Sequence, residues 1–288
     1  MAEGSADVAA YYDNLSRFLD FAQQFGRGGG SQDSSTHRFL SANAEEIHDE
    51  HHGPQRLDLL VMEAATAAGL PSRPRVLDAG CGLGGTIFRW QERLGGRYDG
   101  LTLSPEQHRR ATAEAERRGI AESCSFHIRS YQDSIAPRSY DAVVAIESLA
   151  HSPDPIATVS NLAPALVPEG LMLIVDDIPD RQTGNARLAA FRKSWRCPVL
   201  ADACSYRAAI AAAGLTLVHE IDLTARLRPR RLAWLKILIA AFGLAYRLLP
   251  SRAARDILDA LRGGFLLEAL YRENAMRYLL IVAKRPTA

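Results

Sequence analysis

The sequence is poor in cysteine and carries no excess of charge of either sign. Its 288 residues include four cysteines, 34 basic side chains and 33 acidic ones, which leaves a formal net charge of +1. The cysteines lie far apart without a C-x-x-C pair, so neither a disulfide framework nor a structural zinc site is indicated. Because so small a net charge provides no overall field for a polyanion, we do not expect the chain to bind nucleic acid.

A secretory signal is also missing from the N-terminus. The opening residues, MAEGSADVAA, have neither the basic start nor the apolar run that such a signal needs. Hydrophobic residues make up 47% of the chain and charged residues 23%, which is typical of a folded globular protein rather than a disordered tail or an integral membrane bundle. These features predict a cytoplasmic protein in a reducing compartment.

Short β-rich runs alternate with helical stretches over most of the chain. This alternation predicts an α/β protein with a Rossmann-like, doubly wound and mostly parallel seven-stranded sheet, covered on both faces. The expected strands are 75–80, 98–103, 124–129, 140–146, 170–176, 215–223 and 277–283. The expected helices between them are 86–94, 105–118, 155–167 and 202–213. Ligands of such sheets bind beyond the carboxyl ends of the strands.

Two segments fall outside this alternation and set the predicted domain boundaries. Residues 1–70 read as an N-terminal helical cover, which includes a short helix within 7–25, and 71–223 form the core. Residues 224–276 are long and helical in character, so we predict a helical insertion before the last strand, which returns to the core at 277–288.

The loop after the first strand, VLDAGCGLGG, contains the most informative residues. Gly80, Gly82 and Gly84 or Gly85 allow a sharp turn and a close approach of a ligand to the backbone. The spacing G-x-G-x-x-G fits a dinucleotide and hydride transfer, although the next strand ends in LTLS without an acid for a ribose hydroxyl. With Asp78 the loop also reads D-x-G-x-G, in which the acid serves the amino end of S-adenosylmethionine.

Three segments together resemble one family, the class I S-adenosylmethionine-dependent methyltransferases. VLDAGCGLGG resembles their motif I, and GLTLSPEQ is similar to the G-x-T-L-S-x-x-Q segment of the cyclopropane-synthase-like, sterol and tocopherol members. AIESLAHSPDP is similar to the segment after the fourth strand of sterol C-methyltransferases and tocopherol methyltransferases. The resemblance covers about 71–223 and the final strand.

The resemblance implies a set of cofactor-binding residues. Gln107 takes the ribose in place of the usual acid, Ser130 stands where an aspartate is common, and Tyr131 is a neighbouring wall. The complete expected set is Asp78, Gly80, Cys81, Gly82, Thr102, Leu103, Gln107, Ser130, Tyr131 and Ile146. Cys81 also reads as a small packing residue, since the adjacent glycines provide no general base beside it.

Glu147 and His151 are the candidate catalytic residues. Methyl transfer from a sulfonium needs mainly alignment and exclusion of water, but methylation of an alkene also needs a group that removes a proton. Alternatively, Glu147 contacts only the backbone, and His151 caps or anchors its loop. The favoured acceptor is a small lipophilic molecule, an isoprenoid or related natural product, methylated at carbon. The alternatives are O- or N-methylation of a small metabolite, a nicotinamide-dependent oxidoreductase and a non-enzymatic membrane-associated scaffold.

No metal site is expected from the sequence. His48 and His52 lie one helical turn apart but do not form H-E-x-x-H, so 48–52 reads as a solvated helix end. Arginines near the site would suit a diphosphate, and only such a substrate would bring Mg²⁺. Four aromatic residues are candidates for the wall of an acceptor pocket, namely Tyr131, Trp195, Trp234 and Tyr271.

The segment 225–255 is strongly basic within a nearly neutral chain. It holds eight lysines and arginines and no acid, around an apolar stretch, 232–249, that contains Lys236 and Arg247. At 1.5 Å per residue this stretch would span roughly 27 Å as a helix, marginal for crossing a bilayer. Three interpretations stay open: a helix that covers the core, a lid over a lipophilic acceptor, and peripheral contact with an anionic membrane. The sequence carries no signal of oligomeric state.

Overall fold

A computed structural model describes residues 40, 55–180, 186–248 and 252–287 of the chain. The helix expected within 7–25 and the histidines at 48–52 lie outside the described residues. All four cysteines are free thiols.

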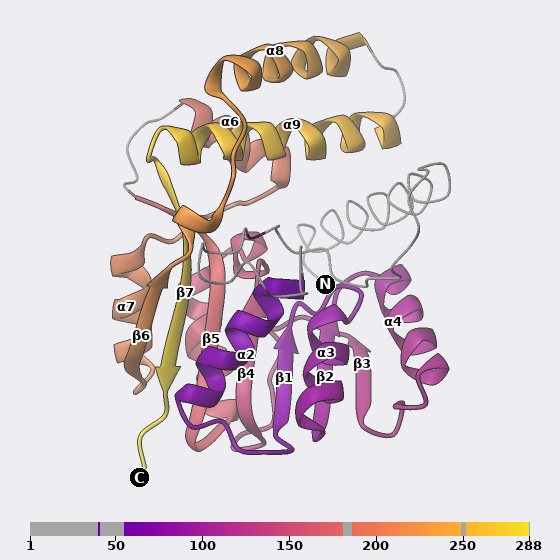
Figure 1. Cartoon of the computed structure of the whole chain (residues 1–288), viewed down its shortest axis with the longest axis vertical. Helices are drawn as coiled ribbons and strands as arrows, with labels where there is room; N and C mark the ends of the chain where they lie inside the picture. Colours follow the sequence, from indigo (N-terminus) through magenta and orange to yellow (C-terminus); the bar gives the residue numbers. More distant parts are fainter. Residues whose placement is uncertain (1–39, 41–54, 181–185, 249–251, 288) are drawn as a thin grey trace, which may run out of the picture.

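Seven strands form one sheet in the order β3-β2-β1-β4-β5-β7-β6 (Figure 1). The strands β1 to β5 are parallel, and β7 runs antiparallel to both β5 and β6. This confirms the doubly wound, mostly parallel sheet. The strands are β1 (Arg75–Ala79), β2 (Arg97–Thr102), β3 (Cys124–Ile128), β4 (Tyr140–Ile146), β5 (Leu166–Pro179), β6 (Thr216–Asp222) and β7 (Met276–Lys284).

Helices cover both faces of the sheet because successive strand residues point to opposite sides. Val76 of β1 belongs to the same apolar cluster as Ile87, whereas its neighbour Leu77 shares the other cluster with Val159 and Ile210. The first face is covered by α2 (Gln55–Ala67), α3 (Gly85–Leu94) and α4 (Pro105–Arg117), and the second by α5 (Pro155–Leu162) and α7 (Ala203–Ala212).

The helix expected over 155–167 is shorter than predicted. Asp154 accepts hydrogen bonds from the amides of Ile156 and Ala157 and starts α5, which ends at Leu162. A 3₁₀ turn, η3 (Ala163–Ala165), follows, and Leu166 already pairs with Tyr140 as the first residue of β5. Pro164 lacks an amide N–H and cannot continue the α-helical ladder, which accounts for the early end.

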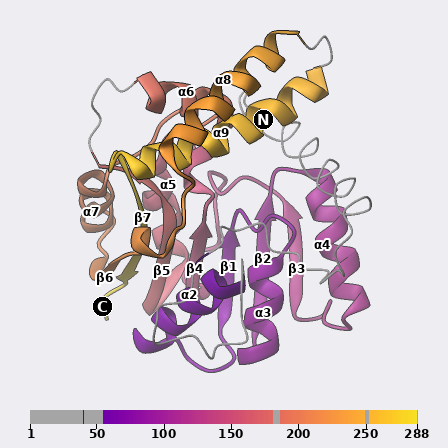
Figure 2. The same ribbon diagram turned by 45° about the horizontal axis from the view of Figure 1, so that its top comes forward.

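The remaining helices gather beyond the carboxyl ends of the parallel strands. They are α6 (Ala186–Trp195), α8 (Leu232–Leu248) and α9 (Arg252–Arg272), which we call the cap; α9 lies next to the sheet and α8 on the far side of α9 (Figures 1 and 2). The insertion between β6 and β7 is helical, as predicted, and also includes the 3₁₀ turn η4 (Thr224–Arg226). Helix α6 was not predicted.

The packing of α6 on α9 is very close. The indole Nε1 of Trp195 donates to the carbonyl of Ala260 at 2.8 Å, and Arg196 forms an ion pair with Asp256 at 2.6 Å. A β-carbon on Gly263 would lie 2.0 Å from the indole ring of Trp195, so glycine is required there. The ring of Trp195 therefore fixes α6 to α9 from inside the cap.

The carboxylate of Asp58 joins α2 to α3. It is fully buried and accepts hydrogen bonds from the hydroxyl of Thr86 and from Nε of Arg89, each at 2.7 Å. The Asp58 carbonyl accepts a third hydrogen bond from the indole of Trp90 at 3.0 Å. A buried carboxylate persists only when it is paired and hydrogen-bonded in this way, so Asp58 fixes α2 against α3.

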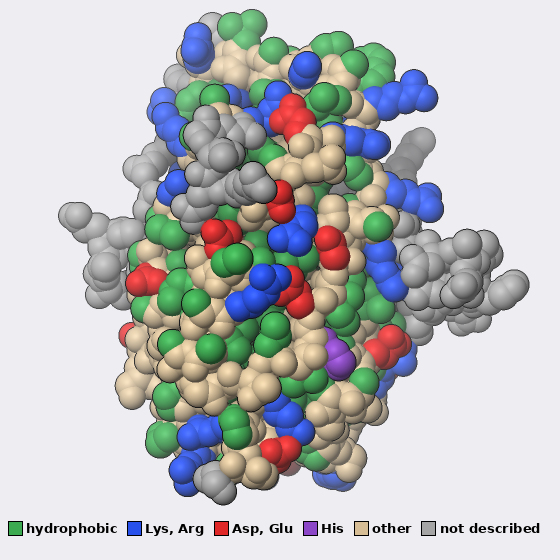
Figure 3. Space-filling model, turned by 90° about the vertical axis from the view of Figure 1, so that its left-hand side faces the viewer, with side chains coloured by type: hydrophobic (Ala, Val, Ile, Leu, Met, Phe, Trp, Pro, Cys, Tyr) green, Lys and Arg blue, Asp and Glu red, His purple; other side chains and the backbone are tan. Residues whose placement is uncertain are grey.

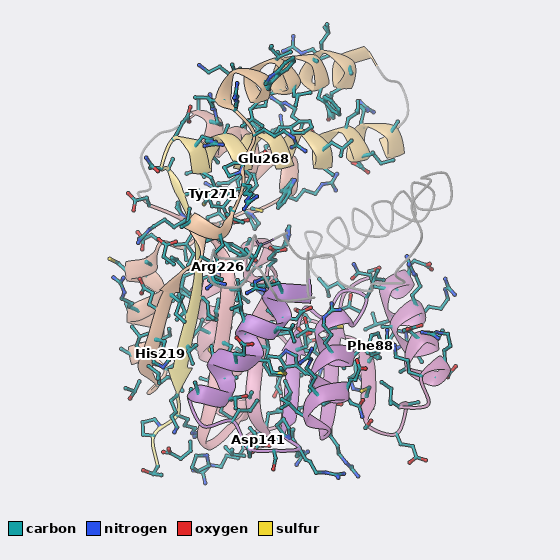
Figure 4. All side chains as sticks on the ribbon, in the orientation of Figure 1. Phe88, Asp141, His219, Arg226, Glu268 and Tyr271 are labelled. Carbon is teal, nitrogen blue, oxygen red and sulfur yellow. The ribbon has the colours of Figure 1, made fainter. Side chains whose placement is uncertain are left out.

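Replacing Asp58 with alanine should lower the free energy of unfolding by about 3–5 kcal/mol, because Arg89 and Thr86 would lose the buried carboxylate to which both bond. Urea denaturation measures the change. The control is Asp141→Ala at the opposite end of the sheet from the cap (Figure 4), where the carboxylate accepts the exposed amide of Arg75. We expect a loss of about 1 kcal/mol there, and equal losses would contradict the assigned role of Asp58.

Candidate functional site

The glycine loop after β1 makes a tight turn at the carboxyl edge of the sheet. The amides of Gly80 and Cys81 both donate to the carbonyl of Leu101, at 3.1 and 2.9 Å. Gly80, Gly82 and Gly84 have φ values of 110°, 54° and 84°, a region that L side chains rarely adopt. The backbone of this loop thus accounts for Gly80, Gly82 and Gly84, whereas Gly85 is the first residue of α3.

Ser148 connects three loops at this edge. Its hydroxyl donates to the carbonyl of Ala79 at 2.7 Å, and its own carbonyl accepts from the hydroxyl of Tyr131 at 3.2 Å. A β-carbon on Gly80 would lie 2.4 Å from the Ser148 β-carbon. The loops that follow β1, β3 and β4 therefore meet around Ser148, and the predicted residues Gly80 and Tyr131 come together there.

A second part of the site lies where β2 meets α4. The hydroxyl of Thr102 donates to Oε1 of Gln107 at 2.8 Å and accepts from the amide of Ser104 at 3.1 Å. Ser104 in turn caps α4 by accepting from the amide of Gln107. Because Thr102 bonds to Oε1, the Nε2 group is the donor side of the Gln107 amide.

Asp78 and Cys81 lie on the two sides of the first turn. Asp78 is the penultimate residue of β1 and is buried, with 3% of its surface exposed. Burial, together with the charge of Asp78, raises the pKa of the Cys81 thiol well above its usual range. Cys81 is thus a protonated packing residue, and a β-carbon on Gly100 would lie only 2.8 Å from its sulfur.

Carboxylates and tyrosines meet at the ends of β4, β5 and β7. Oε1 of Glu147 accepts from the hydroxyl of Tyr278 at 2.6 Å, and the Asp177 carboxylate accepts from the hydroxyl of Tyr271. Asp176 accepts the amides of Ala150 and Asp177 at 2.9 and 2.8 Å. We call Glu147, Asp176, Asp177, Tyr271 and Tyr278 the acidic cluster.

The acidic cluster lies in an environment that disfavours negative charge. Burial, and secondarily the negative charge of Asp177, raise the pKa of Asp176 to about 8. Glu147 has a φ of 52°, an uncommon value for a residue with a side chain, and its amide donates to Val175 at 2.7 Å. Perturbed carboxyl groups and strained backbone of this kind concentrate at functional sites.

Sequence reasoning missed three members of the acidic cluster: Asp176, Asp177 and Tyr278. The available signal was the pair of acids in LIVDD, directly after a buried apolar run. Both aspartates are almost fully buried, at 2% and 4% exposure. Two consecutive acids at the carboxyl end of a central strand lie at the ligand edge of the sheet, where such residues carry chemistry.

His151 connects the site with the cap. It ends the 3₁₀ turn η2 (Leu149–His151), and burial lowers its pKa to about 4, against the opposing effects of a hydrogen bond to the Arg196 backbone and the charge of Glu147. Its imidazole is therefore neutral at physiological pH and able to accept a proton. The predicted pair Glu147 and His151 interact electrostatically.

The remaining predicted residues have structural contacts of their own. The Ser130 hydroxyl accepts from the Gln132 amide at 3.1 Å, Ile146 is buried in the core, and Leu103 is half-buried beyond the end of β2. The proposed wall position of Trp234 is wrong, because this side chain is 62% exposed on α8. Tyr271 is buried on the side of α9 that faces the sheet (Figure 4).

Within the described residues, no group of three or more histidine, cysteine and acidic side chains is arranged to hold a metal ion.

Comparisons with known proteins point in one direction. A family model described as "Methyltransferase domain" matches residues 50–220. The chain is 33% identical over 128 residues to a ubiquinone biosynthesis O-methyltransferase of Xanthomonas axonopodis pv. citri, covering 42% of this chain and 52% of the relative. It is 33% identical over 102 residues to a chloroplastic tocopherol O-methyltransferase of Arabidopsis thaliana, covering 35% and 29%. The chain thus spans about half the length of these curated relatives, or less.

Solved structures share the complete fold. The geranyl diphosphate C-methyltransferase of Streptomyces coelicolor A3(2), in complex with Mg²⁺, geranyl-S-thiolodiphosphate and S-adenosyl-L-homocysteine, superposes with a TM-score of 0.72. The alignment covers 99% of each chain at 19% sequence identity. At this identity the likeness concerns the arrangement of the chain, including the helices beyond the sheet.

We expect the His151 imidazole to titrate near pH 4 in the folded protein, measured by NMR of protein with labelled histidine and assigned with His151→Gln. In the unfolded chain a histidine binds its proton near pH 6.5. Between these values protonation favours the unfolded chain, so the stability that His151 contributes is present above pH 6.5 and is lost as the pH falls toward 4. Titration near pH 6.5 in the folded protein would show that burial does not control this group.

Proposed function

Because the chain belongs to the methyltransferase domain family, and so is an S-adenosylmethionine-dependent methyltransferase, we propose that its acceptor is a small lipophilic molecule. The acceptor we favour is an isoprenoid or related natural product, methylated at carbon. The observation that carries this proposal is the acidic cluster between the sheet edge and the helical cap. A group that can accept a proton in a place shielded from water suits the methylation of an apolar molecule.

The residues at the sheet edge fit the cofactor. The turn at Gly80 has no room for a β-carbon, and the Gln107 amide presents donors of the kind that ribose hydroxyls accept. In our assignment Asp78 serves the amino end of the methionine part, and Gly82 and Cys81 complete the loop beside it. The residues that border the adenosine are Thr102, Leu103, Ser130, Tyr131 and Ile146. When bound, the cofactor supplies an electrophilic methyl group on a sulfonium.

The chain's own residues then align the acceptor and remove a proton. Glu147 is oriented by the hydroxyl of Tyr278, and the neutral imidazole of His151 stands beside it. Methylation of an alkene carbon leaves a cation that loses a proton, and either group is suited to accept it. In this proposal Glu147 is the base and His151 assists it, while the cap excludes water from the reaction.

Oxygen is the second candidate for the methylated atom. The curated relatives carry the names of O-methyltransferases, of ubiquinone biosynthesis and of tocopherol, whereas the named C-methyltransferase shares the fold at low identity. Deprotonation of a phenol before transfer would use the same base, Glu147. Ubiquinone, tocopherol and geranyl diphosphate, the molecules in these three names, each have an isoprenoid part. This supports a lipophilic acceptor whether carbon or oxygen is methylated. Mg²⁺ enters only if the acceptor carries a diphosphate.

Gly80→Ala should weaken binding of S-adenosylhomocysteine by about tenfold or more, measured by calorimetry, because the new β-carbon displaces Ser148 and the loops it connects. The matched control is Gly119→Ala, which also has a positive φ of 69° but faces open space. There we expect a loss of stability of about 1 kcal/mol and unchanged binding. Unchanged binding in Gly80→Ala would remove this loop from the cofactor site.

Incubation with ¹³C-methyl S-adenosylmethionine and a panel of isoprenoid, phenolic and amine acceptors tests the acceptor class. We expect a labelled C–CH₃ signal with an isoprenoid, whereas an O–CH₃ signal would favour the second candidate.

Glu147→Gln should reduce turnover about a hundredfold while S-adenosylhomocysteine binding is retained, with the exposed Glu122→Gln as control. Full activity of Glu147→Gln would exclude Glu147 as the base. In the acceptor panel, transfer to polar amines alone would contradict a lipophilic acceptor.

A further inference from the structure

The outer face of α8 carries an apolar stripe that no other described element covers. Trp234, Ile237 and Leu244 are 62%, 59% and 60% exposed, and Ala241 is exposed between them. Positions 234, 237, 241 and 244 recur at intervals of three and four residues and so form one line along the helix. Large side chains rarely gather on a surface in this way without a binding role.

The opposite face of α8 is already used for packing on α9. Leu235 is fully buried, and the rings of Phe242 and Phe265 meet edge to face with centroids 5.2 Å apart. The guanidinium of Arg255 lies 6.0 Å from the ring centre of Tyr246. The helix is therefore held mainly by its inner face, and most of the surface of the stripe is left exposed.

Basic side chains border the stripe. Lys236 and Arg247 are exposed, and at 3.6 residues per turn they lie within about 20° of each other around the helix, beside the apolar line. Arg228 and Arg231 are exposed just before the helix begins. No acid occurs in 225–255. Of the three acids of α9, Glu268 pairs with Arg230 and Asp256 with Arg196, and Asp259 is the third. Hydrophobic and basic side chains gather along the top of the molecule (Figure 3).

We propose that this face of α8 docks on the surface of a membrane that contains anionic lipid. An exposed tryptophan and aliphatic side chains flanked by lysine and arginine are what an interfacial helix presents to acyl chains and phosphate groups. Among the described helices, none has the length and apolarity needed to cross a bilayer, so α8 lies along the surface. The inference depends only on this face and holds whichever acceptor is methylated.

A second copy of the chain fits this face less well. In a two-fold symmetric contact the same patch meets itself, which would gather Lys236 and Arg247 of both copies at one interface without an acid from 225–255 to pair with them. Such like charges repel at close range. Anionic lipid instead complements the basic border.

Fluorescence of the full chain tests the docking directly. The chain has three tryptophans, of which Trp90 is buried and Trp195 is packed in the cap, so Trp234 is the one that water reaches most. Vesicles of phosphatidylcholine with about one third phosphatidylglycerol should shift the emission to the blue, and vesicles of phosphatidylcholine alone should shift it much less. The shift should disappear in Trp234→Phe although this variant still co-sediments with the anionic vesicles.

Paired variants separate the two parts of the surface. Lys236→Glu with Arg247→Glu, and separately Ile237→Ser with Leu244→Ser, should each weaken co-sedimentation with anionic vesicles by about tenfold or more. The controls are Arg97→Glu and Ile221→Ser, exposed residues of β2 and β6, which should bind like the unchanged protein. Equal binding of all variants, or no binding by the unchanged chain, would overturn the proposal. A dimer in solution that dissociates in Ile237→Ser with Leu244→Ser would assign the face to a second copy instead.

Discussion

The contact between Gly80 and Ser148 is the constraint on which the site depends. Because Gly80 has no β-carbon, Ser148 lies close to the first turn. Its hydroxyl donates a hydrogen bond to the carbonyl of Ala79 at 2.7 Å. The same residue accepts the hydroxyl of Tyr131. A single small residue thus holds the loops of β1, β3 and β4 together, at the sheet edge where we propose that the cofactor binds.

A second set of interactions couples the sheet to the cap. Tyr271 of α9 donates to Asp177 of β5, and the backbone of Arg196, at the end of α6, bonds to His151. Arg196 also pairs with Asp256 of α9. The acidic cluster and His151 are therefore positioned partly by residues that belong to the cap.

The cap has two faces with different environments. Its inner face, on α6 and α9, lies against the acidic cluster, where burial raises the pKa of Asp176 and lowers that of His151. Its outer face on α8 exposes apolar and basic side chains. A lipophilic acceptor and an anionic membrane surface would be served by the same group of helices from opposite sides, which gives a physical reason for elaborating this segment.

The sequence by itself determined the strands, most helices and the glycine turn, because hydrophobic periodicity and positive φ are properties of neighbouring residues. It could not show that Tyr278 meets Glu147, since these residues are 131 positions apart and only the strand order brings β7 near β4. Nor could it determine which side of α8 is buried. Helix α8 is apolar around most of its circumference, so its sequence does not indicate which face is buried. The packing of α9 against one face decides this and leaves Trp234 exposed on the other.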